Sequence, residues 1–454
     1  MTLNTGRNGG RLTGLSCSVL AFLIALWTLQ VDKAAAAAPS TVAPESVGFS
    51  SERLKRLDEA MQRAVDEKQY AGVVTLLARH GKVIHFSALG QKDIASGAPL
   101  EKDTIFRINS MTKPLTAAAM MILYEEGRWT PQDPVFKFVP QFQNLKVFKG
   151  TDATGKLVLE DPAHPPTMRE LMTHTAGFGY EFNVPDPPKP LYRDDQGHPL
   201  WSSGSLQAMV DRLAKAPLVY EPSTRWQYSI SVDIQGYIIE KLSGMTLPDF
   251  MKKRLLAPLG MKDTDFYVPQ EKRSRFVTAY ERNAQGNLTP IEFKQYGLTY
   301  DREPDCPAGG AGMISTAVDY YRFAQMLANG GTLDGARILG PETVKLMMSS
   351  HIAPNLMPDF RGGGYVYIEP RPGLGFGFNG VVITDPGMAD TPTGKGTYFW
   401  EGANGTWFWV DPANDIVFVG MVQRSGYGES WGMVPNLREI SRATVYQALL
   451  RPDL

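Results

Sequence analysis

The chain has 454 residues, 20% of them charged, and a formal net charge of −1 at pH 7. This length is enough to bury the core of one large domain or of two closely joined ones. A nearly neutral chain without a basic stripe or an acidic tail gives no reason to expect nucleic acid or an anionic lipid surface as its partner.

Residues 1–38 have the pattern of a secretory signal peptide. Two arginines precede an apolar run over 15–29, and alanines fill positions 34–38. A transmembrane anchor is the alternative, but a span needs about 18 or more continuous apolar residues, and this run is shorter. We therefore expect cleavage near Ala37 or Ala38, a periplasmic or secreted protein, and no stable membrane span after cleavage.

A helix and a hairpin are expected next. Apolar residues recur at helical spacing over 51–68, after a serine that is able to cap the helix. Two β-rich runs, 72–78 and 83–89, are separated by His80-Gly81, and this pattern predicts an antiparallel hairpin.

From Ser110 to about residue 350 the pattern is mainly helical, with long polar loops. A capping box begins at Thr167. Longer helical runs are predicted at 205–215, 231–243, 246–256 and 315–328. Three loops, at 145–165, 180–204 and 285–305, are expected to shape the pockets of a site.

The C-terminal part returns to β-structure and ends in a helix. Strands are predicted at 375–384, 396–402, 405–411 and 415–423, and the helix at 434–450. Because strands joined by short turns pair antiparallel, we expect an α+β fold whose sheet combines 45–109 with 370–454, flanked by the terminal helices. Residues 110–369 then form an inserted, mainly helical subdomain, with a site in the cleft between the two parts.

Ser110 and Lys113, in "INSMTKPLTAAAMM", are the first candidates for chemistry. On a helix, residues i and i+3 share a face, so the amine can reach the hydroxyl. A lysine whose pKa is lowered by burial can take the serine proton, and N–H groups at a helix start can stabilise an oxyanion. About one Ser-x-x-Lys is expected by chance in a chain of this size, so a plain N-cap role for Ser110 stays open at this point.

Two later stretches offer partners for this pair. In "YEPSTRWQYSISVDIQGYIIEKLSG", Tyr228 stands just before a predicted helix, and a tyrosine beside an ammonium can relay a proton. "YFWEGANGTWFWVDP" predicts a strand, a turn and a second strand. Gly402 would let a substrate approach the strand closely, and the N–H of Ala403 is a candidate second oxyanion donor beside that of Ser110.

Three short motifs and two longer stretches follow one another along the chain. In chain order they are Ser110-Met-Thr-Lys113, 171–178, Tyr228-Ser-Ile230, 309–331 and Trp400-Glu-Gly402. In this order and spacing they resemble the serine beta-lactamase-like hydrolases, from about residue 45 to the C-terminus. The resemblance implies an antiparallel sheet flanked by terminal helices, an inserted helical domain, and a site in the cleft between them.

Two positions depart from the penicillin-recognising members of that family. Those members usually have asparagine at the position of Ile230 and lysine at the position of Trp400. The isoleucine offers no hydrogen bond and the carboxylate-binding cation is absent, so uncharged, more apolar substrates are favoured. A Trp-Gly-Gly third motif is typical of the family VIII carboxylesterases. This chain is similar, with Glu401 in the middle place, where a carboxylate would oppose an oxyanion unless it points away or is paired.

The resemblance implies two-step acyl transfer on a small-molecule ester, without a cofactor or a metal. The implied catalytic residues are Ser110, Lys113 and Tyr228, the backbone oxyanion donors are Ser110 and Ala403, and the substrate contacts are Trp400, Gly402 and Ile230. Whether the lysine or the tyrosine takes the first proton stays open. The alternatives are weak beta-lactamase, D-amino-acid peptidase or amide hydrolase activity and, from another class, a non-catalytic cell-envelope binding protein.

Other residues have simpler interpretations. Ser430 lies in a Gly-x-Ser-x-Gly stretch typical of alpha/beta-hydrolases, but their histidine follows the serine, and the last histidine here is His351. We interpret Ser430 as a turn residue, His174 as a structural hydrogen-bonding side chain, and Asp233 as a first-turn helix carboxylate. The histidines show no metal-ligand spacing with a carboxylate.

Overall fold

The structure is a computed structural model that describes residues 39–202, 204–283, 285–292, 299–356, 372–425 and 436–454. The predicted signal peptide and Ser430 lie outside the described residues. Within these ranges, no helix is both long enough and apolar enough to span a membrane.

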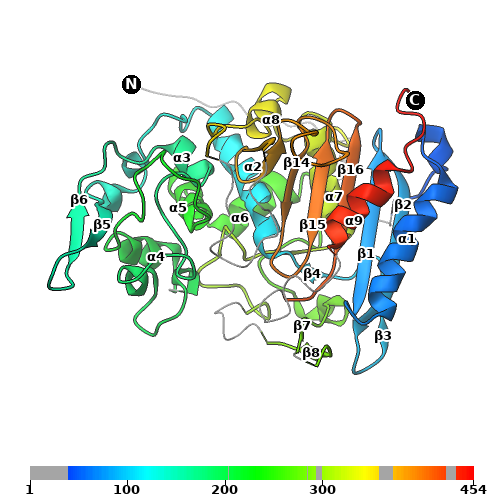
Figure 1. Cartoon of the computed structure of the whole chain (residues 1–454), viewed down its shortest axis with the longest axis horizontal. Coiled ribbons are helices and arrows are strands. Elements are labelled where there is room, and N and C mark those ends of the chain that lie inside the picture. The colour runs from blue at the N-terminus through cyan, green and yellow to red at the C-terminus, as the bar shows by residue number, and fades with distance from the viewer. Residues whose placement is uncertain (1–38, 203, 284, 293–298, 357–371, 426–435) are drawn as a thin grey trace, which may run out of the picture. The chain divides into compact units, whose positions relative to one another are not determined.

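An eight-stranded antiparallel sheet combines strands from both ends of the chain (Figure 1). Its order is β12-β13-β14-β15-β16-β1-β2-β3. The strands are β1 (Gly72–Arg79), β2 (Lys82–Asp93), β3 (Ala98–Pro99), β12 (Leu374–Phe376), β13 (Val381–Ile383), β14 (Tyr398–Glu401), β15 (Trp407–Asp411) and β16 (Ile416–Met421). The N-terminal hairpin joins the C-terminal strands where β1 pairs with β16, with Val74 opposite Met421.

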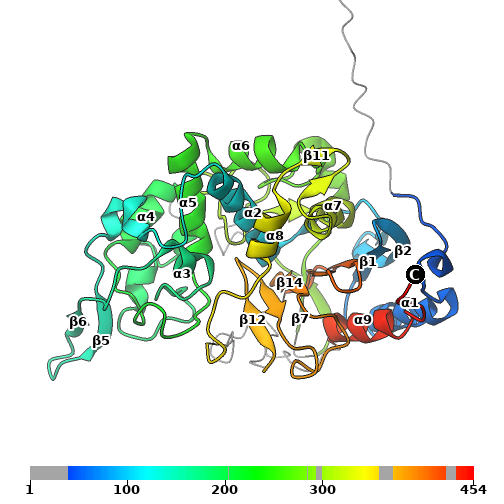
Figure 2. The ribbon, with the colours of Figure 1, turned by 90° about the horizontal axis from the view of Figure 1, so that it is seen from above.

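Helices cover both faces of this sheet (Figure 2). Helices α1 (Ser51–Asp66) and α9 (Leu437–Tyr446) pack side by side on one face, and α7 (Ala317–Ala328) packs on the other against β1, β15 and β16. Strands β1 and β16 are buried along their whole length because both of their faces are covered, which explains their continuous apolar sequence.

The remaining helices form the mainly helical part of the chain. They are α2 (Thr112–Glu125), α3 (Met168–Met172), α4 (Leu206–Leu213), α5 (Ser231–Ser243), α6 (Leu247–Met251) and α8 (Pro341–Met347). Helix α2 is buried nearly all round and packs against α5, as the apolar run over 117–123 favours. Short 3-10 turns lie at Pro44–Val47, Asn109–Met111, Val135–Lys137, Pro140–Phe142, Lys189–Tyr192, Leu200–Ser202 and Gln270–Arg275, and a π-helical turn, Lys252–Leu256, continues α6.

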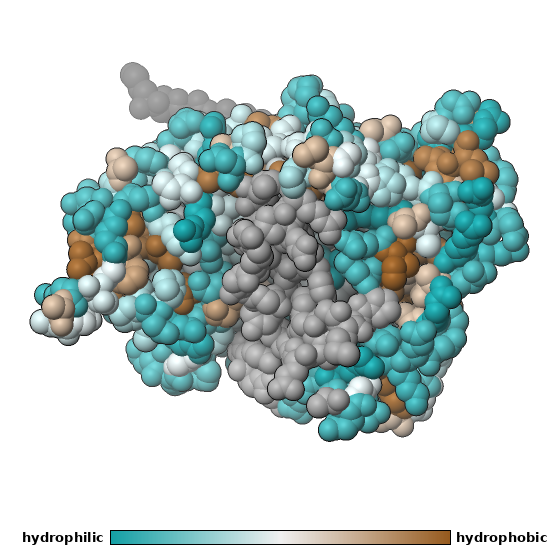
Figure 3. All heavy atoms as spheres, viewed as in Figure 1, coloured by the Kyte–Doolittle hydropathy of each residue, from teal (hydrophilic) through white to brown (hydrophobic). Residues whose placement is uncertain are grey.

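Four two-stranded pairs complete the described structure. They are β4 (Phe106–Arg107) with β9 (Ile314–Ser315), β5 (Val147–Thr151) with β6 (Leu157–Glu160), β7 (Tyr280–Arg282) with β8 (Leu288–Pro290), and β10 (Thr332–Leu333) with β11 (Ala336–Arg337). The exposed surface seen in Figure 3 is mostly hydrophilic, with small and separate apolar areas.

The predicted helices and strands are found close to their expected bounds, with two differences. The run 375–384 is divided into β12 and β13, because the chain turns back at Asn379, whose φ is 56°. The expectations of loops over 145–165 and 285–305 are wrong in part, since the first segment contains the β5–β6 hairpin and the second contains strand β8. The turn of the β5–β6 hairpin is fixed by Asp152, whose carboxylate accepts the N–H groups of Thr154 and Lys156.

Candidate active site

Ser110 stands in a 3-10 turn, Asn109–Met111, between β4 and α2. The N-cap of α2 is Met111, and no side chain caps this helix. The alternative interpretation of Ser110 as a plain N-cap is therefore wrong. Asn109 has a φ of 43°, a left-handed conformation that asparagine tolerates better than most residues, and such strain is frequent beside functional side chains.

Lys113 reaches back from the first turn of α2 to Ser110. Its Nζ lies 3.3 Å from Oγ of Ser110 and donates to the carbonyl oxygen of Gly310 at 2.7 Å. Burial lowers the pKa of Lys113 to about 7, and the charge of Asp233 acts in the opposite direction. A large fraction of the amine is therefore neutral near pH 7 and able to accept a proton.

Tyr228 approaches the same hydroxyl from a distant part of the chain, just before α5. Its Oη donates to Oγ of Ser110 at 2.6 Å. The ammonium of Lys113 lies 4.5 Å from the centroid of the Tyr228 ring. The structure thus brings the hydroxyl, the amine and the phenol together, in a geometry suited to moving a proton away from Ser110.

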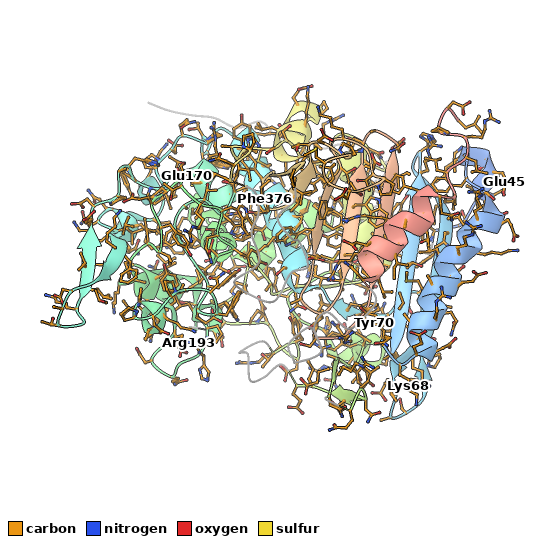
Figure 4. The ribbon with its side chains drawn as sticks, viewed as in Figure 1. Glu45, Lys68, Tyr70, Glu170, Arg193 and Phe376 are labelled. Atoms are coloured by element: carbon orange, nitrogen blue, oxygen red, sulfur yellow. The ribbon has the colours of Figure 1, made fainter. Side chains whose placement is uncertain are left out.

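An aromatic cluster surrounds the phenol. The ring centroid of Tyr228 lies 5.1–6.2 Å from those of His174, Tyr180, Trp400 and Trp226. Phe376, at the edge of the sheet nearest the helical part, contacts three of these rings (Figure 4). Such packing restricts the orientation of the ring and so the direction of its hydroxyl.

Two of the predicted substrate contacts are buried side chains. Trp400 is 0% exposed and packs against Tyr228, and Ile230 is 2% exposed at the start of α5. Trp400 therefore forms part of the apolar surroundings of the phenol, and contact of either residue with a substrate stays a prediction.

Glu401 points away from Ser110. Successive side chains of a strand alternate between faces, so Trp400 faces Tyr228 while Glu401 faces α9. There its carboxylate pairs with Arg438. Arg442 lies nearby; burial lowers the pKa of its guanidinium to about 10, while Glu401 opposes this shift. The carboxylate in the middle of the third motif is thus paired on the opposite face of the sheet.

Gly402 allows two backbones to meet. A Cβ at this position would lie 2.3 Å from the carbonyl oxygen of Ile108 and 2.3 Å from Oγ1 of Thr406. In the structure, the backbone that comes close to Gly402 is therefore the segment leading to Ser110. Close approach of a substrate to Gly402 stays a prediction. Ala403 follows directly, at the start of the turn between β14 and β15, and its role as an oxyanion donor stays a prediction.

Asp233 is a site residue that sequence reasoning missed. It stands in the first turn of α5, as expected, but it is 1% exposed. Its Oδ1 accepts the N–H of Gly310 at 3.0 Å, and Oη of Tyr180 donates to Oδ2 at 3.4 Å. Burial raises the pKa of Asp233, and Lys113 opposes this shift. The Gly-Gly-Ala-Gly sequence over 309–312 was the available signal, because such a stretch allows close packing of a backbone.

His174 has the structural position that its sequence context suggested. Its Nδ1 lies 3.0 Å from Oγ of Ser229, and its ring packs beside Tyr228. Burial and the charge of Lys113 lower the pKa of His174 well below its ordinary value. Across the described ranges, no group of three or more His, Cys, Asp or Glu side chains is placed to hold a metal ion.

Known proteins resemble this chain over most of its length. Residues 57–438 match the family described as Beta-lactamase. Protein Rv1367c of Mycobacterium tuberculosis is 35% identical over 372 residues, which cover 80% of this chain and 88% of that protein. Esterase EstB of Burkholderia gladioli is 30% identical over 408 residues, which cover 85% of this chain and 94% of EstB.

A solved structure agrees with these matches. EstCE1, described as a hydrolase with promiscuous acyltransferase activity, superposes with a TM-score of 0.71 at 29% identity, covering 87% of this chain and 99% of its own. The motifs, the antiparallel sheet with its helices and these similarities agree on one assignment. The chain belongs to the Beta-lactamase family and is a serine beta-lactamase-like hydrolase related to the carboxylesterases.

Proposed function

We propose that the protein is a carboxylesterase for short-chain acyl esters that works through an acyl-enzyme on Ser110. The observation that carries the proposal is the convergence of Oη of Tyr228, at 2.6 Å, and Nζ of Lys113, at 3.3 Å, on one buried hydroxyl. The name of the relative EstB, an esterase, supports the same activity.

The reaction proceeds in two steps. Oγ of Ser110 attacks the ester carbonyl carbon while its proton passes to Lys113 and Tyr228, and the N–H groups of Ser110 and Ala403 stabilise the oxyanion. The C–O bond to the alcohol breaks as the alkoxide takes that proton. Water then attacks the acyl-enzyme carbonyl and gives a proton to the same pair, which passes it to Oγ of Ser110 as the acyl C–O bond breaks and the carboxylic acid leaves.

The substrate preference follows from the residues around the phenol. Trp400 and Ile230 provide neither a cation for a carboxylate nor an amide for a hydrogen bond. The aromatic cluster around Tyr228 is similarly apolar. Uncharged esters should therefore react faster than beta-lactams or D-alanyl peptides.

Acyl transfer to an alcohol is a second candidate function. The similar protein EstCE1 is described as a hydrolase with promiscuous acyltransferase activity. The same acyl-enzyme would serve, with an alcohol in place of water in the second step. Adding a primary alcohol during turnover and measuring the ratio of new ester to free acid tests this candidate; formation of acid alone contradicts it.

We also propose that the protein is exported to the periplasm or the medium. The charged start, the apolar run over 15–29 and the alanines at 34–38 support this. Determining the N-terminus of the protein from fractionated cells is the test. A chain that retains residues 1–38 in the cytoplasm contradicts the proposal.

The activity is tested with para-nitrophenyl esters of increasing acyl length, with nitrocefin, and with a D-alanyl peptide. We expect fastest release from acetate or butyrate, and none from the Ser110→Ala variant. Absence of Ser110-dependent release refutes the esterase. Faster turnover of nitrocefin or of the peptide favours amide chemistry, and an acyl-enzyme that forms but never hydrolyses, seen by intact mass, favours a binding protein.

A further inference from the structure

One glycine connects Lys113 to a buried carboxylate. The carbonyl oxygen of Gly310 accepts Nζ of Lys113 at 2.7 Å, and its N–H donates to Oδ1 of Asp233 at 3.0 Å. A Cβ on Gly310 would lie 2.8 Å from Oδ2 of Asp233 and 2.9 Å from Oη of Tyr180. Gly310 therefore links the amine of Lys113 to the carboxylate of Asp233, and any larger residue at this position would displace Asp233 or Tyr180.

Asp233 has neutral partners in the described structure. It accepts from the N–H of Gly310 and from the hydroxyl of Tyr180, and it makes no direct ion pair with any side chain in the described ranges. A buried carboxylate without an ion pair is costly to maintain. Lys113, equally buried, is the nearby cation whose charge it can balance.

We propose that Asp233 is a positioning residue of this site. Through Gly310 it keeps the amine of Lys113 directed at Ser110, and its negative charge balances the ammonium that forms during acylation. The O–H bond of Ser110 breaks, an N–H bond forms on Lys113, directly or by way of Tyr228, and Asp233 stays ionised throughout. The inference rests on the proposed Ser110 esterase.

Other titratable groups face the pair from several elements. Tyr228 and Tyr180 place their rings 4.5 and 5.5 Å from Nζ of Lys113. His174 lies behind Tyr228, and the charge of Lys113 helps to lower its pKa. Burial raises the pKa of Glu181 to about 7, the same range as that of Lys113, so this residue needs a variant of its own.

The test variant is Asp233→Asn. Its amide oxygen is still able to accept the N–H of Gly310, but the charge is lost. With para-nitrophenyl butyrate, we expect the acylation rate constant to fall about tenfold or more while the apparent binding constant is unchanged. The acid limb of the pH profile should move down by roughly one pH unit, because an amine without its counter-charge loses its proton more readily.

Three further variants make the result specific. Asp233→Glu, which restores the charge, should recover part of the acylation rate. Glu181→Gln should leave the acid limb of the pH profile, which we assign to Lys113, at its wild-type pH. Asp319→Asn removes another buried first-turn carboxylate, in α7, and should reduce stability without moving the limb. The proposal is overturned if Asp233→Asn keeps both the wild-type acylation rate and the wild-type position of the acid limb in the pH profile.

A second route covers the case in which Asp233→Asn does not fold. Gly310→Ala leaves both charges but forces Asp233 and Tyr180 aside, and acylation should fall in a folded protein; an unchanged rate overturns the proposal. The pKa of Lys113, measured by 13C NMR at its ε-carbon, should be lower in Asp233→Asn than in wild type. This titration needs no turnover, so it tests the interaction of Asp233 with Lys113 even if the wild-type protein releases no nitrophenol. Absence of Ser110-dependent release would refute the proposed esterase but would leave this interaction to be tested by the titration.

Discussion

Replacing Tyr228 with phenylalanine removes one hydroxyl and keeps the packing of the ring. The lost group is the donor 2.6 Å from Oγ of Ser110, whereas the contacts with Trp226 and Trp400 remain. Loss of a positioned proton carrier should slow acylation by about 10²–10⁴-fold, or about 2.7–5.5 kcal/mol. The free energy of unfolding should fall much less, by about 0.5–1.5 kcal/mol for one hydrogen bond.

The two effects are separated by burst kinetics with para-nitrophenyl butyrate and by urea unfolding. Tyr192→Phe is the matched control, because Tyr192 is also buried and its hydroxyl donates to the carbonyl of Pro217 at 2.7 Å. This control should lose similar stability and keep the wild-type burst. If Tyr228→Phe also keeps the wild-type burst, the phenol is not part of the proton path, and the assignment of its role fails.

Three other changes have definite expected outcomes. The kcat/KM should fall as the pH is lowered through about 7, because Lys113, with a pKa of about 7, becomes protonated and can no longer accept a proton; a pH–rate profile measures this. Glu401→Gly creates a Trp-Gly-Gly motif but removes the buried carboxylate that pairs with Arg438, and should lower the free energy of unfolding in urea by about 3 kcal/mol. Gly402→Ala should slow acylation by about 10²-fold in burst kinetics, because its Cβ would displace the Ile108 backbone that leads to Ser110.

Each of these predictions has a contradicting result. If kcat/KM does not change between pH 6 and 8, Lys113 is not the base that accepts the proton of Ser110. An unchanged urea midpoint in Glu401→Gly would show that the pair with Arg438 contributes nothing to stability. For Gly402→Ala the control is Gly387→Ala, where the added Cβ meets only ordinary contact distances, and equal activity of the two variants contradicts the displacement.

Local features of the fold were predictable from the sequence. The serine cap of α1 and the capping box at Thr167 are both formed, because each depends on residues within one turn. The reach of Lys113 to Ser110 is local in the same sense. Tyr228 is different: it lies 118 residues from Ser110, and its contact was suggested by its place before a helix and by the family pattern.

Two details that depend on long-range packing were not predictable. Strand alternation separates Trp400 from Glu401, but which of them faces Ser110 depends on where α9 packs. The burial of Asp233 depends on Gly310, 77 residues further along the chain. Neither the period of a helix nor that of a strand carries this information, because it arises from the assembly of separate elements.

The pairing of β1 with β16 determines when the sheet can close during synthesis. Strand β1 leaves the ribosome early, but its partner is made near the end of translation. A lone hairpin of β1 and β2 is marginal by itself, so the nascent chain has no complete sheet to hold it until its last strands emerge. A stop codon before residue 416 would therefore leave β1 with an unpaired edge prone to aggregation.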